Sequence, residues 1–191
     1  MEMDTSPLDN ILGLLALVSY VATLLPTIMR IVFPQIKKNS IPKWLLKHRR
    51  TIGIITFFFA LGHGLLVIKK RTFDLFDPKT YWIYIQGAVT LIVFALLAIT
   101  SNDWSIKKLK KNWKRLHQLT YPSMFLLTWH VWGKMSGHWT YITPIGIVAS
   151  TGITVLFLIR LWIERQGKQQ KAQAKVPPKA VVSAKSTIKL N

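Results

Sequence analysis

The chain has 191 residues, of which 50% are hydrophobic and none is cysteine, and its formal net charge is +19. The absence of cysteine excludes disulfides, thiolate-bound iron–sulfur clusters and covalent attachment of haem through a C-x-x-C-H motif. Strong positive charge can indicate nucleic-acid binding, but here the Lys and Arg residues flank long apolar blocks, as in the loops of membrane proteins. We therefore expect the lipid bilayer, and no nucleic acid, as the surroundings of this chain.

Five apolar blocks approach the ~20 residues that a helix needs to cross the hydrocarbon core of a bilayer. They cover residues 11–33, 51–68, 81–100, 113–132 and 141–163. We predict an all-α integral membrane bundle of about five transmembrane helices in residues 11–165, preceded by an outer segment of residues 1–10. Residues 166–191 are basic, contain Pro-Pro and lack apolar periodicity. This composition predicts a disordered cytoplasmic tail.

The basic residues between the blocks predict how the bundle is oriented. Two alternate loops and the tail are rich in Lys and Arg, whereas the N-terminal segment carries Glu2, Asp4 and Asp9 and no basic residue. The positive-inside rule therefore places the N-terminus outside and the C-terminus in the cytoplasm. We expect a multi-pass integral membrane protein. The richest loops contain Lys37, Lys38, Lys43, Lys47, Arg49 and Arg50, and Lys107, Lys108, Lys110, Lys111, Lys114 and Arg115.

Two histidines, His63 and His130, lie inside apolar sequence, in FFFALGHGLLV and FLLTWHVWG. An imidazole can bind a metal through one nitrogen while the other nitrogen donates a hydrogen bond. At 1.5 Å per residue His63 lies ~20 Å, and His130 ~25 Å, from the inner face. Two histidines at similar depth on two helices suit a bis-imidazole haem, and Gly62 and Gly64 leave room for its flat ring. Alternatively, each imidazole only bonds a carbonyl across a helix interface.

A third histidine, His117, lies closer to the inner face, and its role stays open. Thirteen residues along a straight helix separate His117 from His130 by ~140° in azimuth, although Pro122 could redirect the helix. His117 could bind a second, inner haem, or it could hydrogen-bond a propionate or a quinone. His48 and His138 lie in loops, where we expect solvated side chains.

Four basic residues near the inner face, Arg49, Arg50, Lys114 and Arg115, are candidates for pairing with haem propionates or a quinone. Arg suits such pairing because its guanidinium binds carboxylates through two parallel hydrogen bonds. Anchoring by the positive-inside rule is the simpler explanation of these residues.

The segments RRTIGIITFFFALGHGLLV, LLAITSNDW and NWKRLHQLTYPSMFLLTWHVW resemble the ferric reductase-like transmembrane domain family over residues 10–165. The resemblance is greatest to short bacterial members, which include haem-binding membrane subunits of periplasmic methionine sulfoxide reductase systems. It implies a bacterial inner membrane and b-type haem bound by His63, His117 and His130, with electrons moving from the inner to the outer face. Relatives fused to FAD and NADPH domains usually have a histidine at the position of Arg49. At this position the short members have arginine, as this chain does. Short members usually have six spans, whereas this sequence predicts five.

These observations predict a transmembrane electron-transfer protein with one or two b-type haems and, at the inner side, a quinone or FMN. The donor would be a separate cytoplasmic flavin reductase or a membrane quinol, and the acceptor ferric iron or a periplasmic oxidoreductase. Whether the chain is itself a reductase or a subunit of one stays open. A non-redox transporter is the alternative, but it would need acidic groups that the interiors of blocks two to five lack. A second alternative is an assembly factor for a larger membrane complex, which would dock through the basic tail.

Overall fold

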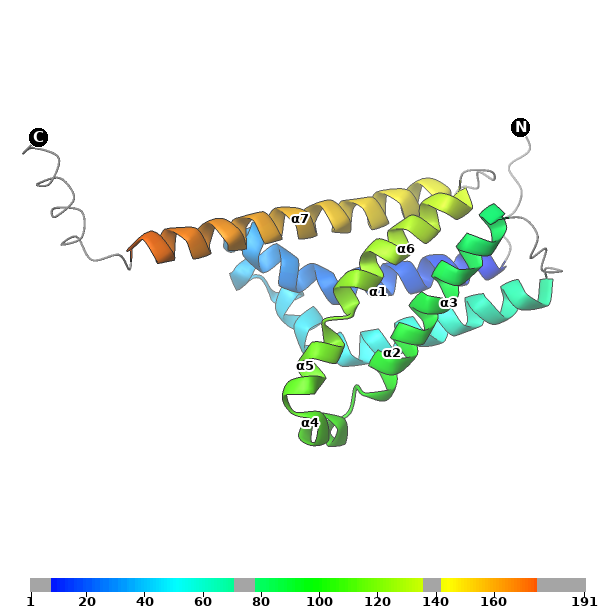
Figure 1. Ribbon diagram of the computed structural model, residues 1–191, viewed down its shortest axis with the longest axis horizontal. Helices are drawn as coiled ribbons and strands as arrows, with labels where there is room; N and C mark the ends of the chain where they lie inside the picture. Colours follow the sequence, from blue (N-terminus) through cyan, green and yellow to red (C-terminus); the bar gives the residue numbers. More distant parts are fainter. Residues whose placement is uncertain (1–7, 71–77, 136–141, 175–191) are drawn as a thin grey trace, which may run out of the picture.

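The computed structural model describes residues 8–70, 78–135 and 142–174, and helices account for nearly all of them (Figure 1). No strand occurs in these described ranges, so the predicted all-α fold is confirmed. The elements in chain order are α1 (Leu8–Val32), the 3₁₀ helix η1 (Pro34–Lys38), α2 (Ser40–Lys70), α3 (Pro78–Ile99), α4 (Asp103–Leu109), α5 (Lys111–His117), α6 (Thr120–Met135) and α7 (Thr143–Ala174).

Four of these helices are long and apolar enough to cross a membrane, over residues 8–32, 40–69, 81–99 and 144–173. The shorter helix α6, with 16 residues, packs against both α3 and α7 (Figure 1). At 1.5 Å per residue, α6 is ~24 Å long, somewhat less than the ~30 Å of a hydrocarbon core. The four long apolar helices make the chain an integral, multi-pass membrane protein, built as a helix bundle.

The fourth predicted span, residues 113–132, is not one continuous helix. Helix α5 ends at His117 and α6 begins at Thr120, whose hydroxyl donates to the His117 carbonyl over 2.7 Å. Pro122 stands in the first turn of α6, where its missing N–H removes no helical hydrogen bond. The ~140° separation of His117 and His130, which assumed a straight helix, therefore does not apply.

Two other helices are longer than the apolar pattern predicts. Helix α2 begins at Ser40, so the basic stretch before residue 51 is helical. Helix α7 continues to Ala174 and includes residues 166–174, which the sequence analysis assigned to a disordered tail. These nine residues are mostly Gln, Lys and Ala, which have high helix propensity. The rest of the predicted tail lies outside the described residues.

Helix α1 forms the centre of the bundle, and its buried face meets residues of α3, α6 and α7. The buried cluster consists of Tyr20, Leu24, Ile28, Phe94, Met124, Ile153 and Phe157. Polar contacts reinforce it, since the Tyr20 hydroxyl donates to the Thr120 carbonyl and Arg160 donates to the Tyr121 hydroxyl over 3.1 Å. Because lipid is as apolar as a leucine side chain, such packing and hydrogen bonding hold membrane helices together.

Replacing Leu24 with alanine is expected to destabilise the bundle by about 2 kcal/mol or more, because Leu24 is only 1% exposed and the change leaves a cavity. Leu15, on the same helix but 40% exposed, provides the matched control. Unfolding in mixed micelles, followed by circular dichroism, measures both variants. Equal stability of Leu24→Ala and Leu15→Ala would contradict the central position of α1.

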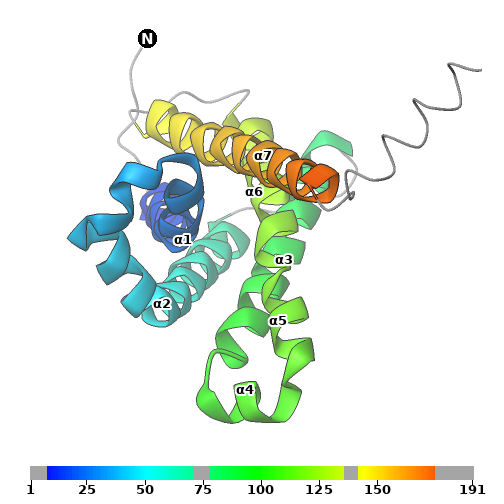
Figure 2. The same cartoon turned by 90° about the vertical axis from the view of Figure 1, so that its left-hand side faces the viewer.

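Helices α4 and α5 lie at one end of the bundle, between the end of α3 and the start of α6 (Figure 2). Asn102 caps α4, because its side chain accepts a hydrogen bond from the Ser105 N–H over 2.7 Å. A salt bridge of 2.7 Å between Arg50 and Asp103 joins α4 to α2. Both side chains are exposed, so this bridge contributes little to stability.

The pKa of Asp103 lies below its usual range, mainly because Arg50 donates a hydrogen bond to the carboxylate and also attracts it electrostatically. A lowered pKa in the folded chain means that the stabilising contact exists at neutral pH and is lost as the pH falls through that pKa. We expect Arg50→Gln to return the pKa of Asp103 toward the ordinary aspartate value. Carboxyl ¹³C NMR during an acid titration measures this shift, and Lys107→Gln, which removes a weaker attraction, should change it less.

Candidate functional site

His63 lies on α2 and contacts the first turns of α1. Its Nδ1 atom is 2.7 Å from the carbonyl oxygen of Asp9. Because a carbonyl oxygen can only accept, Nδ1 must carry the proton and donate it. The ring lies directly against Gly13, since a Cβ atom added at Gly13 would be 3.1 Å from Nδ1 and 3.2 Å from Cε1. The contact therefore combines a hydrogen bond with close packing of the ring against a glycine.

His130 lies on α6 and makes the corresponding contact with α3. Its Nδ1 atom is 3.0 Å from the carbonyl oxygen of Ile83 and is again the donor. A Cβ atom added at Gly87 would be 3.1 Å from Cε1 and 3.5 Å from Nδ1 of the His130 ring. Both membrane histidines are thus partly buried and held in the same way by a neighbouring helix.

The contacts of α3 place the two rings at similar depth in the bundle. Gly64, the residue after His63, faces Leu91 of α3, whose Cδ2 would be 3.5 Å from a Cβ at Gly64. Gly87, which the His130 ring contacts, lies four residues before Leu91. Four residues of α-helix span ~6 Å, so the two rings lie within about one or two turns of each other along the bundle.

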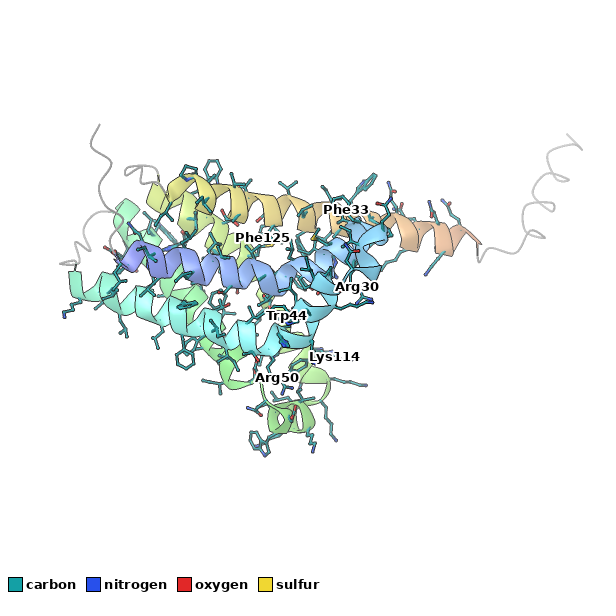
Figure 3. All side chains as sticks on the ribbon, turned by 180° about the vertical axis from the view of Figure 1, so that it is seen from behind. Arg30, Phe33, Trp44, Arg50, Lys114 and Phe125 are labelled. Atoms are coloured by element: carbon teal, nitrogen blue, oxygen red, sulfur yellow. The ribbon has the colours of Figure 1, made fainter. Side chains whose placement is uncertain are left out.

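A cavity of about 520 Å³ opens between α1, α2, α3, α5 and α6, at the end of the bundle where the basic residues gather. We call this the basic end. Lys47, Arg49, Arg50, Lys114 and His117 all line the cavity. Figure 3 shows Arg50 on α2 and Lys114 on α5 close to each other at this end. Such a concentration of cations around one cavity favours an anionic ligand group, because Arg and Lys make charge-assisted hydrogen bonds to carboxylates and phosphates.

His117 stands at the end of α5 and faces this cavity. Its ring stacks on Trp113 at a centroid distance of 4.1 Å, and its Nε2 lies 3.3 Å from the Thr100 hydroxyl. Trp113 in turn donates from Nε1 to the Thr100 carbonyl over 2.9 Å. These contacts fix the imidazole at the wall of the cavity, beside Arg49 and Arg50.

The other candidate residues have different surroundings. Arg115 is exposed and is not part of the cavity wall. His48 is not the solvated residue that we expected, since its ring is half-buried and stacks on Trp44 at 4.6 Å. Its buried Nδ1 has no hydrogen-bond partner among the residues that the structure describes. His138 lies outside the described residues.

Sequence reasoning missed several residues of these sites. Gly62 and Gly64 were assigned space for a macrocycle, but they face Leu12 and Leu91 of neighbouring helices. Among the described glycines, Gly13 and Gly87 are the ones that contact imidazoles. The sequence analysis did not predict them because they lie far from either histidine in the chain. The sequence feature that could have indicated them is an isolated glycine inside an apolar span. Tyr20, Trp113 and Tyr121 also line the cavity and were missed.

The chemistry of the residues suits a haem, in two separate places. His63 and His130 can each offer Nε2 as an axial ligand because Nδ1 donates to a carbonyl, whereas the cations that could pair with carboxylates line the cavity at the basic end, where His117 is the lining histidine among the described residues. The hydrogen bond from Nδ1 to a carbonyl is the usual support of a metal-binding histidine. Simple metal sites of three or more His, Cys, Asp or Glu side chains do not occur in the described part of the chain.

Comparison with known proteins agrees with this interpretation. The model of the family described as "Ferric reductase like transmembrane component" matches residues 12–128. A protein-methionine-sulfoxide reductase heme-binding subunit MsrQ from Xanthomonas campestris pv. campestris (strain B100) is 33% identical over 143 residues, covering 71% of this chain and 63% of the relative. The subunit of the same name from Xanthomonas oryzae pv. oryzae (strain MAFF 311018) is 30% identical over 141 residues, with the same coverages.

A third relative of that name, from Brucella melitensis biotype 1, is 35% identical over 118 residues, covering 59% of this chain and 50% of the relative. The chain thus spans less than two thirds of the length of these curated relatives. No solved structure matches the chain. The family model covers more than half of the sequence, including His63 and His117. The chain therefore belongs to the ferric reductase-like transmembrane family.

Proposed function

We propose that this chain is a haem-binding membrane subunit that carries electrons across the bilayer, with His63 and His130 as axial ligands of one b-type haem. The observation that carries the proposal is the pair of membrane imidazoles at similar depth, each donating from Nδ1 to a helix carbonyl. The relatives support it, because they are named as heme-binding subunits.

Each part of the site has a distinct task in this proposal. When bound, haem supplies a one-electron redox couple. The carbonyls of Asp9 and Ile83 orient the two imidazoles and make their Nε2 atoms better electron donors to a metal. The surrounding helices exclude water, which keeps the site at low dielectric and helps to set its potential. No proton transfer by the chain is required for this task.

The cavity at the basic end is the proposed entry point for electrons. Arg49, Arg50 and Lys114 can pair with carboxylates of haem propionates or with the phosphate of FMN, and His117 can bind a second haem or hydrogen-bond a quinone. The donor would be a cytoplasmic flavin reductase or a membrane quinol. The excess of basic residues at this end favours a cytoplasmic location by the positive-inside rule.

The proposed acceptor lies at the opposite face, outside a bacterial inner membrane. The relatives are named as subunits of a protein-methionine-sulfoxide reductase, which favours an oxidoreductase of that class as acceptor, whereas the family description favours ferric iron. Chemically reduced protein can be mixed in turn with such an oxidoreductase and with ferric citrate. Faster reoxidation by one of them identifies the acceptor class.

Absorption spectroscopy of the purified full chain tests the proposal itself. We expect a Soret band and, after reduction with dithionite, a sharp α band of low-spin, bis-histidine b-type haem. A redox titration then counts the haems by the number of one-electron steps. Protein that is purified from haem-supplied cells and shows no reducible Soret and α bands would contradict the proposed function.

A further inference from the structure

The two histidine contacts share one geometry, and both depend on a glycine at a fixed spacing. In each, Nδ1 donates to the carbonyl of residue i, Asp9 or Ile83, and the ring lies against residue i+4, Gly13 or Gly87. In an α-helix, the side chain of residue i+4 leans back over the preceding turn, where the carbonyl of residue i lies. A side chain at i+4 therefore covers that carbonyl, whereas glycine leaves it open to a second donor.

The spacing also explains how one carbonyl serves two donors. Inside an α-helix the carbonyl of residue i already accepts from the N–H of residue i+4. A carbonyl oxygen has two lone pairs, so the second can accept from imidazole if the approach is open. Added Cβ atoms would approach the rings to 3.1 Å at both Gly13 and Gly87, so the ring or the helix would have to shift by a few tenths of an ångström. A Cβ atom added at Gly152 of α7 would have no neighbour within 4 Å, so that glycine has no such contact.

We infer that Gly13 and Gly87 are positioning residues, which hold His63 and His130 in the Nδ1-protonated tautomer and fix the rotation of both rings. An imidazole protonated at Nδ1 carries its lone pair on Nε2, so both residues present the same nitrogen to a metal. The redox consequence of this inference rests on the proposed function. A carbonyl that accepts from Nδ1 makes the ligand more basic, which stabilises ferric over ferrous iron and lowers the midpoint potential.

The first test needs no haem. The full chain is prepared haem-free with ¹⁵N-labelled histidine, and the His63 and His130 signals are assigned through single His→Gln variants. We expect both histidines of the wild type to show the Nδ1–H tautomer. Gly13→Ala should change the His63 signals alone, and Gly87→Ala those of His130 alone. Gly152→Ala is the matched control and should change neither.

The second test uses the haem-loaded protein. Gly13→Ala and Gly87→Ala should each raise the midpoint potential, shift the g-values of the ferric low-spin electron paramagnetic resonance spectrum, and weaken haem binding about 10-fold. Gly152→Ala should leave all three unchanged. Because alanine has a higher helix propensity than glycine, weaker helices cannot explain such losses. Circular dichroism confirms that each variant is folded, and the two glycines lie on different helices, so each tests the inference separately.

The outcomes separate this inference from the proposed function. If the wild type binds haem but both glycine variants keep its tautomers, potential and g-values, the positioning role is wrong. If the wild type shows the expected tautomers but no haem binds, the positioning role stands and the electron-transfer function is wrong. A change in Gly152→Ala as large as in the other two variants would also overturn the inference, because no ring contacts that glycine.

Discussion

Replacing either His63 or His130 with alanine is expected to abolish the same haem, seen as loss of the same α band and the same step in a redox titration. Each change removes one axial nitrogen, and a low-spin bis-imidazole site requires both. It also removes the Nδ1 donor to the carbonyl of Asp9 or Ile83, and the alanine side chain cannot replace this hydrogen bond. Electron transfer to an outer acceptor should fall to background in both variants.

His48→Ala is the control for this prediction. His48 is also half-buried on α2, but it stacks on Trp44 and does not line the cavity. Its loss should leave the haem spectrum unchanged. Two different haems lost from His63→Ala and His130→Ala would show that the histidines do not share one iron, and a full complement of haem in either variant would remove that residue from the site.

His117→Ala is expected to keep the haem of His63 and His130 but to slow its reduction from the basic end by about 10-fold or more. The reason is that His117 lies in the wall of the cavity at the basic end, which is the proposed entry point for electrons, and is held there by Trp113 and Thr100. If the cavity binds a second haem, the variant also loses one redox step. Stopped-flow reduction, with flavin reductase or a quinol analogue as donor, measures the rate.

The matched control is again His48→Ala, because both histidines stack on a tryptophan four residues earlier, and only His117 lines the cavity. Unchanged reduction rates in His117→Ala would exclude the cavity as the entry point. Complete loss of haem from this variant would instead mean that His117 belongs to the same iron site as His63 or His130.

The helices themselves follow from the apolar blocks, because lipid requires every backbone polar group to be satisfied within the helix. Hydropathy could not predict the break after His117, since it depends on side chains such as Thr120 that bond the carbonyls of a helix end. For the same reason the length of α7 was underestimated, because residues 166–174 are helical without being apolar.

The candidate site was only partly predictable. Histidine in an apolar span is costly, so His63 and His130 could be recognised from sequence. The helix that supports each histidine could not be predicted from sequence. Gly13 and Gly87 lie on different helices from the histidines that they contact, and only tertiary packing brings them together. Likewise, Arg49 and Lys114 lie in separate basic segments, and only the arrangement of α2 and α5 shows that both face one cavity.

The continuous helix α7 has a mechanical consequence. Its 32 residues, at 1.5 Å each, extend ~48 Å, whereas the hydrocarbon core is ~30 Å thick. If the start of α7 lies at one boundary of that core, its last turns extend ~18 Å beyond the opposite boundary as a straight helix. A partner that binds at the basic cavity would have to approach beside this helical extension, so the directions from which it can reach the membrane surface are restricted.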